Sequence, residues 1–156
     1  MTTTRKSLVG LVVGTLALAL VLGPAGAARI DGADHGGRPF TVALTGAAER
    51  PGPGDPDGSG LARITLNLGQ QEVCFHIVVE DIALPATGAH IHVAPVTDPG
   101  PIVVPLTAPG ATGESSGCVE NVDRDLIRAI LRDPENYYVN VHTADFPAGA
   151  VRGQLG

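Results

Sequence analysis

Short segments of alternating apolar and polar residues, separated by turns rich in glycine and proline, run through most of this 156-residue chain. Alternation with a period of two is typical of strands that bury one face. Turn residues recur about every ten positions, which is the spacing of small all-β domains. The pattern therefore predicts an all-β sandwich or barrel of about seven or eight strands. In order, the segments are 40–44, 61–68, 72–80, 85–92, 101–106, 115–120, 137–143 and 150–155.

One segment has a helical period instead. Asp123 can cap its first turn, and Pro134 ends it. Its apolar residues form a single stripe, which indicates a short helix packed on the strands; a helix that binds a partner is the alternative. The stripe consists of Leu126, Ile127, Ile130 and Leu131.

The first 28 residues have the three parts of a secretory signal peptide. Arg5 and Lys6 precede an uncharged apolar run at 8–22, and small residues follow at 23–28. A membrane anchor is the alternative, but the run is shorter than the roughly twenty residues that span a bilayer. We therefore expect a signal peptide at 1–28, a flexible lead-in at 29–38 and one domain at 39–156, in a protein that is secreted.

Removal of the signal peptide makes the chain more acidic. Arg5 and Lys6 leave with it, so eight of the ten cationic residues remain against sixteen acids, a formal charge of −8. A chain with this balance has no basic patch for phosphates, which argues against nucleic acid and anionic membrane partners. The expected partner is a metal ion or another protein.

Two cysteines remain in the exported chain, Cys74 and Cys118. In an oxidising compartment such a pair is expected to form a disulfide. Two buried thiols, or a cysteine that joins a metal site, are the alternatives.

Histidines occur in several of the predicted strands, and in one of them two occupy alternate positions. His90 and His92 share one face of their strand, and His142 lies in another strand. If Val73 faces the core, alternation along the strand points His76 outward. The same alternation in the other strands places His90, His92 and His142 on outer faces as well. Imidazoles from neighbouring strands can converge on one copper or zinc ion.

The histidines can also be explained without a metal. Exposed strand histidines also fill a polar face and hydrogen-bond to loops. Asp145, close after His142, is a candidate to orient an imidazole through its second nitrogen or to serve as an oxygen ligand.

Several spaced motifs together resemble the CHRD domain, a module named after chordin and common in bacterial secreted proteins. The resemblance covers about residues 40–155 and implies an extracellular Greek-key-like β-sandwich or barrel, similar in shape to copper/zinc superoxide dismutase, without a well-established activity. The matching histidines are His90, His92 and His142, whereas His76 is a feature of this chain. The motifs are Leu44-Thr45-Gly46 with Glu49 and Pro51, Gly60-Leu61-Ala62, Val73-Cys74-Phe75, Ala89-His90-Ile91-His92, Gly100-Pro101-Ile102-Val103-Val104, Tyr138-Val139-Asn140-Val141-His142-Thr143 and Gly149-Ala150-Val151-Arg152-Gly153-Gln154-Leu155.

Three functions follow from these observations. The first is a secreted binding or structural module without catalysis, since Ser115 and Ser116 lack a nucleophile motif. The second is an extracellular protein that binds copper or zinc through His90, His92 and His142, with His76 as a further candidate. The third, an enzyme similar to superoxide dismutase, is disfavoured because that bimetal site needs more ligands and an electropositive approach for its anionic substrate.

Overall fold

A computed structural model describes residues 1–2 and 36–156. The predicted signal peptide and most of the lead-in fall in residues 3–35, outside the described residues. Residues 36–156 form eight strands, one α-helix, α1 (Arg124–Arg132), and two short 3₁₀ helices, η1 (Gly46–Ala48) and η2 (Pro134–Asn136). The strands are β1 (Arg38–Thr45), β2 (Ser59–Asn67), β3 (Glu72–Glu80), β4 (Gly88–Val93), β5 (Ile102–Leu106), β6 (Glu114–Val119), β7 (Tyr137–His142) and β8 (Val151–Gln154).

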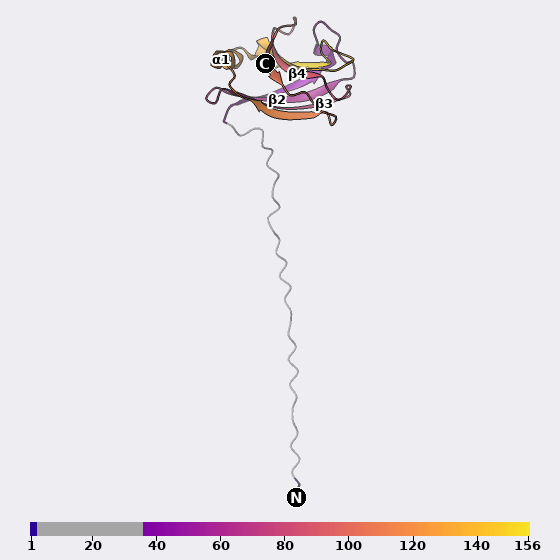
Figure 1. The fold of residues 1–156 in the computed structure, drawn as a ribbon, viewed down its shortest axis with the longest axis vertical. Helices are drawn as coiled ribbons and strands as arrows, with labels where there is room; N and C mark the ends of the chain where they lie inside the picture. Colours follow the sequence, from indigo (N-terminus) through magenta and orange to yellow (C-terminus); the bar gives the residue numbers. More distant parts are fainter. Residues whose placement is uncertain (3–35) are drawn as a thin grey trace.

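The strands form one antiparallel sheet that curls into a nearly closed barrel (Figure 1). Its order is β5-β4-β7-β8-β1-β2-β3-β6, and the two end strands, β5 and β6, contact each other. The chain crosses from β3 to β4 and from β6 to β7 between strands that are not neighbours, which is the connectivity of Greek keys. The predicted all-β barrel with one short helix is confirmed.

The barrel interior is filled by one face of each strand. On β3 the inward residues are Val73, Phe75, Ile77 and Val79, each at most 3% exposed, as the alternation predicts. Opposite them on β2 lie Ala62, Ile64 and Leu66. This aliphatic interior gives the strands a fixed register, because a slip by one residue would turn every apolar side chain outward.

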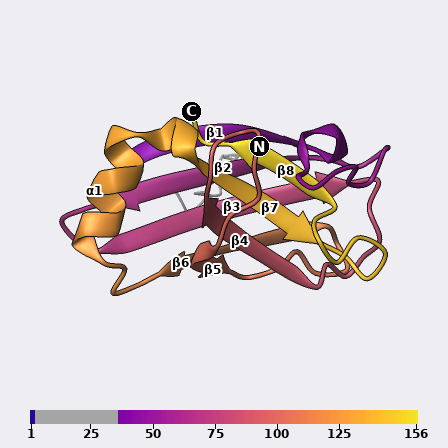
Figure 2. The same cartoon turned by 90° about the horizontal axis from the view of Figure 1, so that it is seen from above.

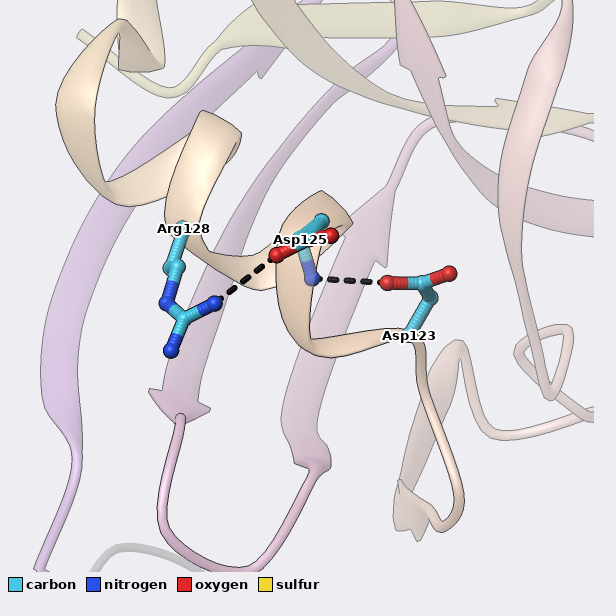
Figure 3. Close-up of polar contacts among 3 residues, drawn as sticks. All are labelled: Asp123, Asp125 and Arg128. Atoms are coloured by element: carbon cyan, nitrogen blue, oxygen red, sulfur yellow. Dashed lines mark hydrogen bonds and ion pairs between the residues drawn. The ribbon is translucent and has the colours of Figure 1, made fainter.

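Helix α1 lies at one end of the barrel (Figure 2). It begins where the Asp123 carboxylate accepts a hydrogen bond from the Asp125 amide (2.6 Å), and Asp125 also pairs with Arg128 (2.8 Å; Figure 3). Ile127 and Ile130 are fully buried in the core. The predicted cap and the packing of the apolar stripe on the strands are therefore confirmed.

The first strand begins two residues before the predicted segment at 40–44 and one residue before the predicted domain boundary at 39. Arg38, assigned above to the lead-in, is the first residue of β1. Its guanidinium donates a hydrogen bond to the Leu131 carbonyl (3.0 Å) and lies over the Phe40 ring (4.9 Å). These contacts with α1 and β1 extend the ordered strand backward along the chain.

The two cysteines form the predicted disulfide. Cys74 on β3 lies directly opposite Cys118 on β6, and the bond joins an interior strand of the sheet to an end strand. A disulfide is consistent with an extracellular protein. None of the helices in the described part of the chain has the length and apolar character needed to cross a membrane.

Candidate metal centre

Strands β4 and β7 bring three of the predicted site residues together. The two strands are antiparallel neighbours, in a register that pairs His92 with Tyr138 and Gly88 with His142. The ring centroid of His90 lies 5.0 Å from that of His142 and 5.5 Å from that of His92. The centroids of His92 and His142 are 6.3 Å apart. One nitrogen from each ring lies within 4.8 Å of the other two. We call these three residues the histidine cluster.

Gly88 provides the room in which two of these rings approach each other. It lies across from His142 and shares a face with His90. A Cβ at this position would lie 3.0 Å from Cε1 of His90 and 3.5 Å from Cδ2 of His142. A larger side chain would therefore push the two imidazoles apart.

The face that carries the histidine cluster is covered, contrary to the expectation of an open outer face. It does lie opposite the core, because Ala89 and Ile91 point inward. His92 is nevertheless only 7% exposed, and Tyr138 and Asn140 are each 2% exposed. The segments 94–101 and 143–150 fold back over these strands and contribute contacts to the cluster. Alternation along a strand does not reveal such a cover.

Two backbone carbonyls fix which nitrogens of the cluster carry protons. Nδ1 of His92 lies 2.8 Å from the Gly100 carbonyl, and Nδ1 of His142 lies 3.1 Å from the Pro147 carbonyl. A carbonyl only accepts, so each Nδ1 carries the hydrogen and each Nε2 keeps its lone pair. These two Nε2 atoms and Nδ1 of His90 are buried without a hydrogen-bond partner. The lone pairs of His92 and His142 are thus oriented in advance, as in metal sites whose ligands are held by carbonyls.

The surroundings also keep the rings neutral. Burial, followed by the proximity of His142 and His92, lowers the pKa of His90 to about 4. Burial lowers the pKa of His92 and of His142 as well, although the carbonyls of Gly100 and Pro147 partly oppose it. Neutral imidazole is the form that binds metals, so the cluster is in its ligating state at neutral pH.

Tyr138 and Arg152, which were not among the predicted site residues, hold His92 in place. The Tyr138 ring stacks on His92 (centroids 4.7 Å apart, planes 8° apart), and its hydroxyl accepts a hydrogen bond from the Gly100 amide (3.2 Å). On Tyr138 lies the Arg152 guanidinium, 3.4 Å from the ring centroid. Arg152 is 1% exposed and donates to the carbonyls of Pro95 and Asp98 (3.0 Å each), which fixes the covering segment. The only indication of this role in the sequence was that alternation places Tyr138 on the same face of its strand as His142.

The other two candidate residues lie elsewhere. His76, on β3, is outside the histidine cluster, and its Nε2 pairs with the Glu114 carboxylate at 2.6 Å. Asp145 is exposed, and the Pro147 carbonyl takes the orienting position next to His142 that the sequence suggested for it.

Acidification is expected to destabilise the metal-free protein through the histidine cluster. Unfolded histidines titrate near their ordinary pKa of 6.5, whereas the folded pKa values are lower, about 4 for His90. Between these values the unfolded state binds more protons, so stability is full above 6.5 and falls as the pH drops. Glu49 acts in the opposite direction, because burial raises its pKa from 4.5 to about 7 and its contribution falls as the pH rises.

Urea unfolding at about pH 7 and about pH 5 measures this dependence. A Glu49→Gln variant removes the opposing group and is expected to lose more stability on acidification than the parent does. Adding His90→Ala to that variant should reduce the loss. An equal pH dependence with and without His90 would contradict the assignment.

The comparisons with known proteins agree with the resemblance seen in the sequence. The family model of the CHRD domain matches residues 40–155, a range that includes the whole histidine cluster. No curated protein and no solved structure matches the chain.

Proposed function

Since the chain belongs to the CHRD domain family, with residues 40–155 matching that domain, we propose that it is a secreted binding module whose ligand is one copper or zinc ion. The ion binds to His90, His92 and His142. The proposal joins the two leading interpretations of the sequence, a binding module and a metal-binding protein, because the module carries a group of converging donors.

The observation that carries the proposal is the convergence of three unpartnered nitrogens. A buried polar atom without a hydrogen bond costs about 1–3 kcal/mol, so three in one place require a reason. A cation bound by the three rings supplies one, since one nitrogen of each ring lies within 4.8 Å of one nitrogen of the other two, and small ring movements allow bonds to a central ion.

Imidazole nitrogens favour copper and zinc over magnesium and calcium, which prefer oxygen ligands. A site made of neutral imidazoles binds a cation, so it does not need the positive surface that would attract an anionic ligand. The acidic chain also raises the local concentration of cations near its surface. Export through the predicted signal peptide would place this activity outside the cell.

A redox enzyme similar to superoxide dismutase receives less support. Its substrate is an anion, and a chain with an excess of acids repels anions. The converging donors in the described part of the chain form one three-histidine group, apart from the group that contains the disulfide sulfurs, so a second metal would need ligands of another kind.

Calorimetric titration of the purified protein with zinc chloride, and separately with copper(II) chloride, tests the proposal. We expect one ion per chain, a rise of the melting temperature when the ion is present, and proton release that stays small near neutral pH because the ligands are already deprotonated. Absence of saturable binding of either ion by the folded protein would end the proposal.

A further inference from the structure

Asn140 adds a fourth buried donor next to the histidine cluster. It lies between Tyr138 and His142 on β7, directly opposite His90, so its side chain projects from the covered face that carries the cluster. The residue is 2% exposed, and its Oδ1 atom is buried without a hydrogen-bond partner. Asn is rarely buried in this way, because its amide has both donors and acceptors to satisfy.

Asn140 has two ionisable neighbours, Glu49 and His92. Burial raises the pKa of Glu49 to about 7, and Arg152 and the Asn140 side chain oppose this rise. Burial lowers the pKa of His92, and the Gly100 carbonyl and the Asn140 side chain partly oppose this. The Asn140 amide therefore lies close to both groups.

Two unpartnered acceptors are buried in this small region. The Gly100 carbonyl holds the hydrogen of His92 on Nδ1, so the Nε2 atom of His92 has a lone pair. Oδ1 of Asn140 is itself an acceptor, and neither atom has another partner. Two buried acceptors side by side repel each other unless a cation lies between them.

The fold holds the Glu49 side chain close to the Asn140 amide. It is 2% exposed, on the segment that follows β1 and η1, far from Asn140 in the sequence. A Cβ on Gly149 would collide with the Glu49 carboxyl group, so only glycine there lets the carboxyl lie under the covering segment. Gly149 has a φ of 145°, a backbone conformation that also favours glycine.

We infer that Asn140 is the fourth metal ligand, through Oδ1, and that Glu49 positions its amide. The inference rests on the proposed function and extends it. The donor set becomes three nitrogens and one neutral oxygen, which suits a four-coordinate divalent ion, zinc or copper(II). A carboxamide oxygen is a hard donor and contributes little to binding of copper(I), which prefers soft ligands. The site therefore selects the divalent ions.

An Asn140→Leu variant tests the ligand, because leucine keeps the branched heavy-atom skeleton of asparagine in this buried position and removes the oxygen. We expect its dissociation constant for zinc to rise by more than about 10-fold, since loss of even an outer polar group at a metal site costs about 10–100-fold. Binding of copper(I), measured by competition with a chromophoric chelator, should change little. Asn140→Asp retains an oxygen and should retain most of the zinc affinity.

Cobalt(II) provides a readout of coordination that stability does not affect. The parent protein loaded with cobalt(II) should show the intense visible bands of a four-coordinate ion, and Asn140→Leu should weaken or shift them. Should the leucine variant fail to fold, as judged by circular dichroism, the side-chain amide resonances of Asn140 in the ¹⁵N-labelled parent must still move on zinc binding.

The outcomes separate this inference from the proposed function. Zinc affinity and cobalt spectra that are unchanged in Asn140→Leu, or amide resonances that do not move, would overturn the role of Asn140 while metal binding by the histidines stands. Failure of the parent protein to bind either ion would overturn both.

Discussion

A His142→Ala variant is expected to lose specific metal binding, with a dissociation constant raised by more than about 100-fold, beyond the effect of removing an outer group. His142 is the histidine that β7 contributes to the cluster, whereas His90 and His92 both come from β4. Without it, the ion loses the one imidazole of the histidine cluster that comes from β7. Calorimetry measures the change, and the rise of the melting temperature on adding zinc should disappear with it.

The fold of this variant should be retained. His142 is the last residue of β7 and is not part of the hydrophobic core, which Val139 and Val141 face. Its melting temperature without metal should therefore stay close to that of the parent.

His76→Ala is the matched control for this variant. His76 is also a strand histidine with a polar partner, but it lies on β3 with Glu114, apart from the cluster. Its removal should leave the affinity for zinc unchanged. Retention of the parent affinity by His142→Ala, or an equal loss in His76→Ala, would contradict the proposed site.

Local patterns were sufficient to predict most of the fold. The alternation in β3 identified its inward residues, Val73 to Val79, because burial of one face is a property of each strand alone. The cap at Asp123 and the stripe of α1 are likewise local, as they depend on residues within a few positions. The disulfide followed from the number of cysteines and the expected compartment.

The surroundings of the histidines could not be predicted in the same way. The backbone carbonyls of Gly100 and Pro147 hold the Nδ1 atoms of His92 and His142. Every residue has a backbone carbonyl, so the sequence does not show which ones contact a histidine. Asp145 was the plausible partner by residue type, yet it lies exposed on the surface. Glu49 lies near the site because β1, which precedes it, and β7 are both neighbours of β8 in the sheet. Such contacts depend on the complete topology, which alternation does not specify.

Removal of the disulfide, in a Cys74→Ala/Cys118→Ser variant, is expected to lower the free energy of unfolding by about 4 kcal/mol. The two cysteines are separated by 44 positions, and this value is the entropy that the cross-link removes from an unfolded loop of that length. Small domains have a total stability of only about 5–15 kcal/mol, so the melting temperature should fall by roughly 10–20 °C. Urea unfolding at equilibrium and thermal melting measure the two quantities.

The position of the disulfide in the sheet explains why no other contact should compensate for its loss. Strand β6 is an end strand of the sheet and has mostly exposed side chains, so apart from the pairing with β3 and the approach of β5 little holds it. Alanine at 74 fills a buried position without a polar atom, and serine at 118 faces solvent. Because the histidine cluster lies on β4 and β7, the folded variant should bind zinc with the affinity of the parent. A loss of less than about 1 kcal/mol would mean that the strand pairing alone holds β6 and that the cross-link adds little.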